Sequence, residues 1–138
     1  MFEQCLYFNA MALARSVERA WTDAFSRFDL TPAQAFCLRA VLAKSVSRPS
    51  ELASTLGVAR ATATRALDQL ARKGLIERET AVEDNRESLV RPTVEARRIA
   101  RAIEGASGGM TTKMKEILGD RAFDELVTRL KKARLALE

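Results

Sequence analysis

The segment ELASTLGVARATATRALDQLARKGLIER, residues 51–78, limits the fold more than any other part of the chain. Apolar residues recur in it at helical spacing on both sides of Gly57, and glycine readily adopts the left-handed conformation that ends a helix. A second glycine, Gly74, follows the next apolar stripe, and the residues after it are typical of a short strand. The segment therefore predicts two helices joined by a tight turn, roughly residues 50–56 and 60–72, and then a strand.

The residues on either side predict further helices and a second strand. Residues 2–28 contain neither glycine nor proline and place apolar side chains every three or four positions, as in one long amphipathic helix. Thr31 and Pro32 supply an N-cap and a first-turn proline for a second helix that reaches about residue 44. The apolar run before Pro92 predicts a second strand, which would pair with the first as a hairpin.

Two more helices are expected in the C-terminal third. The apolar spacing is helical from Thr93 to about Ile103, and the three glycines of Gly105–Gly109 should interrupt or kink the helix there. Asp120 stands where an N-cap is expected for a last helix. The stripe of that helix consists of Phe123, Leu126, Val127, Leu130, Arg134 and Leu137.

The order of helix, glycine turn, helix and hairpin is that of a winged helix-turn-helix. The sequence thus predicts a mainly α fold with a small β-hairpin, in a single domain of residues 1–138. Residues 31–92 would form the winged helix-turn-helix. The apolar face of the first helix is wider than one core needs, so we expect residues 1–28 and 93–138 to be helices that pair two subunits.

The helix predicted at residues 60–72 has an apolar face and a small, cationic face. In a helix-turn-helix the second helix lies in the major groove of DNA, where Arg can bind a guanine edge or a phosphate and Thr a base or the backbone. An ordinary solvated face is the alternative. The candidate DNA-binding residues of this helix are Arg60, Ala61, Thr62, Thr64 and Arg65.

Composition excludes several kinds of chemistry. The chain has no histidine, no phosphate-binding loop and no dinucleotide-binding glycine motif, so we expect no catalytic residues, no metal and no cofactor. Lys and Arg outnumber Asp and Glu by 23 to 18, which suits an anionic partner. No apolar run is long enough to span a membrane, and only two cysteines are present, so we expect a cytoplasmic protein with reduced thiols.

Three stretches resemble the MarR (multiple-antibiotic-resistance regulator) family of winged helix-turn-helix transcription factors: LTPAQ at 30–34, the segment at 51–78 and DNR at 84–86. The resemblance implies a homodimer whose two winged modules read a pseudo-palindromic operator in double-stranded DNA. It also implies that Arg86 enters the minor groove from the tip of the hairpin and that Asp84 helps to hold it.

The chain departs from the family pattern beside the recognition helix and in the hairpin. Ala59 stands where a serine often caps that helix, so an acceptor worth about 1 kcal/mol is absent. Asn85 replaces a basic residue, and residues 91–98 differ from the usual pattern. The hairpin is acidic, which makes its contribution to DNA affinity the weakest expectation; Asp84 and Arg86 could instead form a local ion pair. Its carboxylates are Glu77, Glu79, Glu83, Asp84 and Glu87.

Two signals to such a regulator can be proposed from the residues. The first is a small apolar or anionic effector in a pocket lined by Trp21, Phe25 and Phe36, although residues of this kind are more often core. The second is oxidation of Cys5, because EQCLYFNAMALAR at 3–15 is partly similar to the peroxide-sensing branch of the same family. A buried, inert cysteine is the alternative.

The leading hypothesis is a sequence-specific DNA-binding transcriptional regulator, a homodimeric repressor released by a small ligand or by oxidation. The alternative is a winged-helix protein-interaction module that does not bind DNA, which the acidic hairpin favours and Arg60, Thr64 and Arg65 oppose. A thiol enzyme that uses Cys5 would lack a partner base, and RNA binding would lack an aromatic platform for stacked bases.

Overall fold

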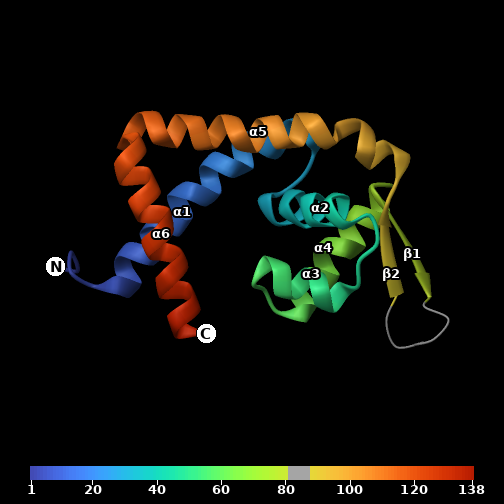
Figure 1. Ribbon diagram of the computed structural model, residues 1–138, viewed down its shortest axis with the longest axis horizontal. Coiled ribbons are helices and arrows are strands. Elements are labelled where there is room, and N and C mark those ends of the chain that lie inside the picture. The colour runs from blue at the N-terminus through green and yellow to red at the C-terminus, as the bar shows by residue number, and fades with distance from the viewer. Residues whose placement is uncertain (81–87) are drawn as a thin grey trace.

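Helices dominate the computed structural model, which describes residues 1–80 and 88–138 (Figure 1). The arrangement confirms a mainly α fold with a small hairpin, in winged helix-turn-helix order. Along the chain the elements are α1 (Leu6–Phe25), the 3₁₀ turn η1 (Ser26–Phe28), α2 (Pro32–Lys44), α3 (Pro49–Leu56), α4 (Arg60–Arg72), β1 (Ile76–Thr80), β2 (Ser88–Pro92), α5 (Val94–Leu118) and α6 (Asp120–Leu137).

The start of α2 and the end of α3 are determined by interactions within one turn of each helix. Oγ1 of Thr31 accepts a hydrogen bond from the Gln34 N–H at 3.2 Å, and the Gln34 side chain accepts one from the Thr31 N–H at 3.2 Å. Pro32 occupies the first turn, where its missing N–H costs nothing. Gly57 closes α3 with a φ of 66°, in the left-handed region. The structure confirms both predicted boundaries.

The core lies between α2, α4 and the base of the hairpin. The side chains of Leu38, Leu67, Leu70 and Val90 have no exposed surface. Burying an aliphatic side chain of this size contributes about 1.5–3 kcal/mol to stability, so this cluster fixes the orientation of α4 against α2. The connection between α2 and α3 adds backbone bonds, because the N–H of Ser47 donates to the carbonyl of Val90 at 2.9 Å and the reverse bond is 2.8 Å long.

α5 runs without interruption through its three glycines, so the predicted break was wrong. A Cβ added at any of the three would meet no atom within 4 Å, which places them on the open side of the helix. Ser107, which lies among them, is buried, and its Oγ accepts hydrogen bonds from Trp21 of α1 at 3.4 Å and from Arg39 of α2 at 3.1 Å. Each glycine costs the helix about 1 kcal/mol, and the contacts of Ser107 oppose that cost.

The start of α6 also differs from the prediction. Gly119, with a φ of 87°, is the N-cap, and Asp120 is the first helical residue rather than the cap. Glycine adopts this positive φ without strain, and the chain changes direction there between α5 and α6. Asp120 stays in the first turn, where the helix dipole favours a negative charge.

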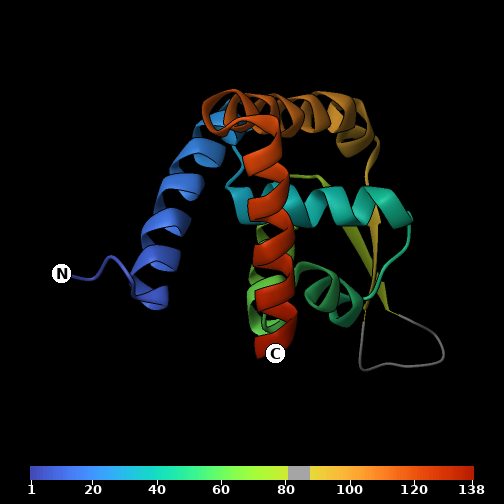
Figure 2. The ribbon, with the colours of Figure 1, turned by 60° about the vertical axis from the view of Figure 1, so that its left-hand side comes forward.

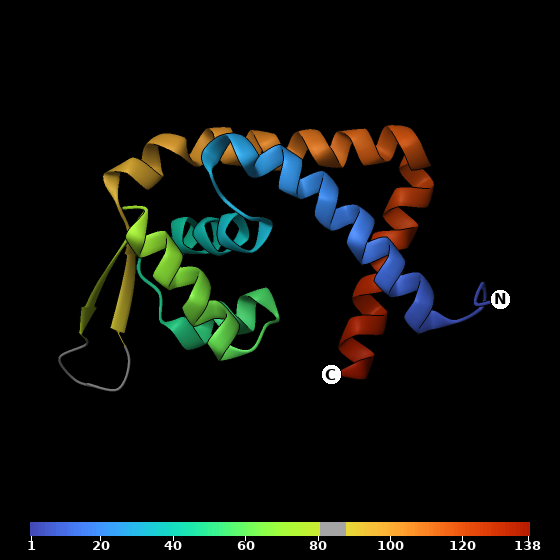
Figure 3. The same cartoon turned by 180° about the vertical axis from the view of Figure 1, so that it is seen from behind.

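α5 runs along one edge of the molecule, and α1 and α6 project from it at the end away from the hairpin (Figures 2 and 3). Both projecting helices carry exposed apolar side chains at helical spacing, and exposed faces of this kind mark interaction sites. The side chains are Leu6, Tyr7, Phe8, Met11, Leu13 and Val17 on α1, and Val127, Leu130, Leu135 and Leu137 on α6. Among residues 1–80 and 88–138, no helix is both long and apolar enough to cross a bilayer.

Candidate nucleic-acid interface and adjoining cavity

The first two turns of α4 present a small, cationic surface at one end of the molecule. Arg60, Ala61, Thr64 and Arg65 are exposed, whereas Ala63 between them faces the core. The N-terminus of α4 lies at the same end of the molecule as the ends of β1 and β2 that are farthest from α5 (Figure 3). Small side chains between two arginines leave room for a nucleic-acid backbone to approach this helix.

Thr62 lies apart from the other candidate residues of α4. Its side chain is half-buried, and its Oγ1 accepts a hydrogen bond from Nη2 of Arg65 at 3.3 Å. The sequence grouped Thr62 with the exposed face, whereas the structure places it at the border between that face and a cavity. Thr62 therefore orients Arg65 along the helix.

Ion pairs balance part of the acidic charge near the hairpin. Nη1 of Arg78 in β1 lies 2.6 Å from Oδ1 of Asp68 in α4, and Nη2 of Arg91 lies 2.8 Å from Oε1 of Glu79 across the hairpin. Asp68 is paired with Arg78, so its carboxylate does not neutralise the positive charge at the start of α4.

The two hairpin candidates Asp84 and Arg86 lie outside the residues that the structure describes. Their roles at the minor groove remain predictions. The described part of the hairpin shows how its base is held, by antiparallel pairing that begins with Ile76 opposite Pro92.

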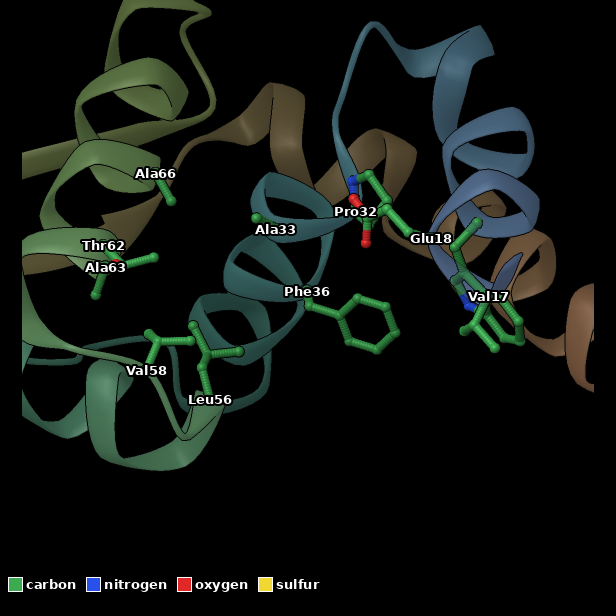
Figure 4. A pocket seen from close by; sticks show the side chains of 11 residues that line it. Val17, Glu18, Pro32, Ala33, Phe36, Leu56, Val58, Thr62, Ala63 and Ala66 are labelled. Atoms are coloured by element: carbon green, nitrogen blue, oxygen red, sulfur yellow. The ribbon is translucent and has the colours of Figure 1, made fainter. Parts of the chain in front are cut away.

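A cavity of about 430 Å³ lies between α1, α2 and α4 (Figure 4). Because residues of α4 form one of its walls, a bound molecule would touch the helix that carries the cationic surface. The wall consists of Val17, Glu18 and Trp21 from α1, Pro32, Ala33 and Phe36 from α2, Leu56 and Val58 at the end of α3 and the following turn, and Thr62, Ala63 and Ala66 from α4.

Two of the three predicted pocket residues, Trp21 and Phe36, line this cavity. The third, Phe25, has no exposed surface and meets the Phe36 ring edge-on, with the ring centroids 5.9 Å apart. Phe25 therefore supports the wall from behind and belongs to the core.

Sequence reasoning missed a polar cluster that joins α1, α2 and α5 behind the cavity. Arg39 donates two hydrogen bonds to Glu104, from Nε to Oε1 at 2.8 Å and from Nη2 to Oε2 at 2.9 Å, and a third to Ser107. The hydrogen bonds from Arg39 lower the pKa of the Glu104 carboxyl below its usual value, so the pair stays ionised at neutral pH. An arginine within the apolar second helix was the available sequence signal.

The two cysteines occupy contrasting environments. Cys37 is fully buried in α2, and burial raises the pKa of its thiol to about 11, so it is protonated and inert at neutral pH. Cys5 is exposed at the N-cap position of α1, and its side chain makes no capping hydrogen bond. Of the two cysteines, only Cys5 is accessible to an oxidant.

The α3–turn–α4 unit, its flanking hairpin and the cationic start of α4 define a winged helix-turn-helix protein. The sequence profile of the MarR family matches residues 30–88, from the turn before α2 to the start of β2. Over these residues the chain matches the MarR family, and its fold is that of MarR-family transcriptional regulators.

Solved structures similar to this chain include proteins bound to DNA. A mutant of MarR from E. coli complexed with operator DNA is 25% identical, with a TM-score of 0.83 over 96% of this chain and 97% of that one. The M. tuberculosis transcriptional regulator MOSR in complex with DNA is 25% identical, with a TM-score of 0.81 over 98% and 99%. The S. aureus MepR–DNA complex, 19% identical, shares the fold with a TM-score of 0.87 over 99% and 100%.

Proposed function

We propose that this chain is a sequence-specific DNA-binding transcriptional regulator that represses by occupying a pseudo-palindromic operator as a homodimer. The observation that carries the proposal is the exposed start of α4, where Arg60, Thr64 and Arg65 follow the turn at Gly57. In this arrangement α4 enters the major groove, its arginines reach base edges or phosphates, and Arg86 would approach the minor groove. The two DNA complexes at 25% identity support the same mode of binding.

The exposed apolar faces of α1 and α6 support the homodimer. Large apolar side chains at helical spacing on two projecting helices would remain in water in a lone chain, and a second copy would cover them. In this assignment residues 31–92 form the DNA-binding region, and residues 1–28 and 93–138 pair the subunits within one domain. Two linked modules then bind two half-sites of an operator.

Replacing Arg65 with alanine tests the recognition helix. We expect the variant to lose about 1–3 kcal/mol of binding free energy for the DNA upstream of its own gene, and clearly less for random DNA, because a base contact is removed. Fluorescence anisotropy across a salt series measures both. The matched control is Arg72→Ala, which removes the same charge from the exposed C-terminal end of α4.

Equal losses for Arg65→Ala and Arg72→Ala, or equal losses on both DNA sequences, would show that Arg65 does not read sequence. If the wild-type protein binds no DNA at low salt, the proposal is wrong, and the winged-helix interaction module becomes the better interpretation.

We further propose that a small ligand in the cavity releases the DNA. Thr62, Ala63 and Ala66 belong both to the cavity wall and to α4, so a ligand that fills the cavity shifts α4 against α2. Oxidation of Cys5 is the second candidate signal. The cavity is better supported because it touches α4 directly, whereas Cys5 stands at the far end of α1.

The cavity wall favours a neutral or cationic aromatic ligand over a carboxylate. Glu18 is the one ionisable side chain among the described lining residues, and the wall is otherwise almost entirely apolar, with Trp21 and Phe36 as aromatic surfaces. Because Trp21 is the single tryptophan of the chain, its fluorescence reports occupancy. We expect phenol and benzylamine to quench it at concentrations at which benzoate does not.

Ala33→Phe, which fills the cavity from α2, is expected to abolish the quenching by phenol and benzylamine. Quenching that persists in Ala33→Phe, or preferential binding of benzoate, would contradict this assignment.

A further inference from the structure

We propose that the C-terminal end of α6 is a second DNA contact, which binds the phosphate backbone beside the half-site that α4 reads. We call residues 129–134 the basic end of α6. This inference rests on the proposed function, because it assumes that α4 docks on DNA. It assigns to α6 a role in addition to pairing the subunits.

The basic end concentrates positive charge without compensation. Arg129, Lys131, Lys132 and Arg134 fall within six residues, and no Asp or Glu occurs between Leu126 and Leu137. All four cations are exposed, and none forms an ion pair with any residue in the described ranges 1–80 and 88–138. Two other surface cations on α5 and α6 do pair with carboxylates, Arg98 with Glu95 and Arg121 with Glu125.

The basic end lies next to the turn that precedes the recognition helix. Nη1 of Arg134 is 3.3 Å from the position that a Cβ on Gly57 would occupy, and Gly57 is the turn between α3 and α4. In Figures 1, 2 and 3 the C-terminal end of α6 reaches the level of this turn and of the ends of β1 and β2 farthest from α5, whereas α5 runs along the opposite edge. DNA bound along α4 would therefore pass the basic end.

The position of Arg134 on α6 separates the basic end from the apolar face of the same helix. Val127 and Leu130 continue at helical spacing to position 134, where an arginine replaces the expected apolar residue. An unpaired charge is costly to bury, so Arg134 itself stays outside the apolar contact, although Leu135 and Leu137 follow it on α6. The charged side of the last turns of α6 then faces solvent or an anionic partner, and double-stranded DNA is the anion that its place beside α4 offers.

Phosphate contacts have a measurable signature. Each cation that neutralises a phosphate releases condensed counterions, and the slope of log K against log salt concentration changes by about 0.9 for each contact. A contact to the backbone also carries no sequence preference. The basic end should thus strengthen binding to any duplex by the same factor, unlike Arg65.

The test replaces three of these cations together, as Lys131→Gln, Lys132→Gln and Arg134→Gln, because glutamine keeps the helix propensity. We expect about a tenfold or greater loss of affinity near 0.1 M salt, equal on a random 30-base-pair duplex and on the DNA upstream of the gene, and a salt slope reduced by at least about 1.

The matched control is Arg97→Gln, Arg101→Gln and Lys113→Gln, which removes three exposed cations from α5. That control is expected to lose less than about threefold, and Lys131→Arg, Lys132→Arg, Arg134→Lys to bind like the wild type.

Four results would overturn the proposal. The α6 variant could match the α5 control in affinity and slope, or lose affinity for one DNA sequence alone. It could sediment as a monomer where the wild type is a dimer, which would assign the cations to the subunit interface. The charge-preserving variant could also fail to restore binding. Each of these leaves the proposed function standing as long as the wild type binds DNA and Arg65→Ala weakens it; a wild type that binds no duplex overturns both.

Discussion

Phe8→Glu combined with Met11→Glu is expected to give a folded monomer that binds operator DNA about a hundredfold or more weakly than the wild type. Both side chains lie on the projecting α1, where they are 45% and 41% exposed, so the lone chain loses little stability. In the dimer two carboxylates would be forced into an apolar interface. A monomer engages one half-site, and the gain from linking two modules, commonly 10²–10⁴-fold, disappears.

Sedimentation at micromolar concentration and anisotropy on the same samples check this prediction. Val94→Glu is the control, because Val94 is 68% exposed in the first turn of α5, outside the proposed apolar faces. A double variant that remains a dimer would show that α1 does not form the interface, and a monomer of undiminished affinity would show that the operator is read by one module.

Leu67→Ala is expected to lower the free energy of unfolding by about 2–5 kcal/mol. Leu67 lies on the inner face of α4 with no exposed surface, among Leu38, Leu70 and Val90. Removing its isobutyl group leaves a void that the surrounding helices cannot fully close. The loss is a large fraction of the total stability of a chain of this size, so α4 would no longer be held at a fixed angle to α2.

Urea denaturation at a fixed protein concentration measures this loss, since subunit pairing makes the midpoint concentration-dependent. The control Val94→Ala, at an exposed position, should change stability by less than about 0.5 kcal/mol. If Leu67→Ala changed the stability by a similarly small amount, the core would tolerate the void. The packing of Leu67 would then not be what fixes the orientation of α4.

The helix-turn-helix could be predicted because its boundaries depend on neighbours in sequence. Thr31 and Pro32 define the start of α2 through bonds within one turn, and Gly57 ends α3 through its own backbone conformation. The inward and outward faces of α4 follow from a repeat of 3.6 residues, which needs no knowledge of the partner that covers them. Thr62 is the exception, since only the position of α1 and α2 decides that it borders a cavity.

The features that escaped prediction depend on residues far apart in the chain. Three glycines predict a break in α5, yet the helix continues because Ser107 among them is held by Trp21 and Arg39. The bond from Arg39 to Glu104 joins residues 65 positions apart, and neither residue carries a local signal of the other. Likewise, the closeness of Arg134 to Gly57 follows from the direction in which α6 leaves Gly119, which spacing alone does not reveal.

Because Ala59 provides no side-chain cap for α4, a capping substitution there would raise the stability of the fold and lower the affinity for DNA. The Ala59 side chain cannot accept a hydrogen bond from the first turn of α4, and the Thr62 N–H donates instead to the Ala59 carbonyl at 3.0 Å. Ala59→Ser would strengthen that turn by about 1 kcal/mol, but the serine oxygen would then occupy the amide groups best placed to receive a phosphate oxygen. An alanine at this position keeps the first turn of α4 without a side-chain cap, so a phosphate oxygen of the nucleic acid can accept hydrogen bonds there.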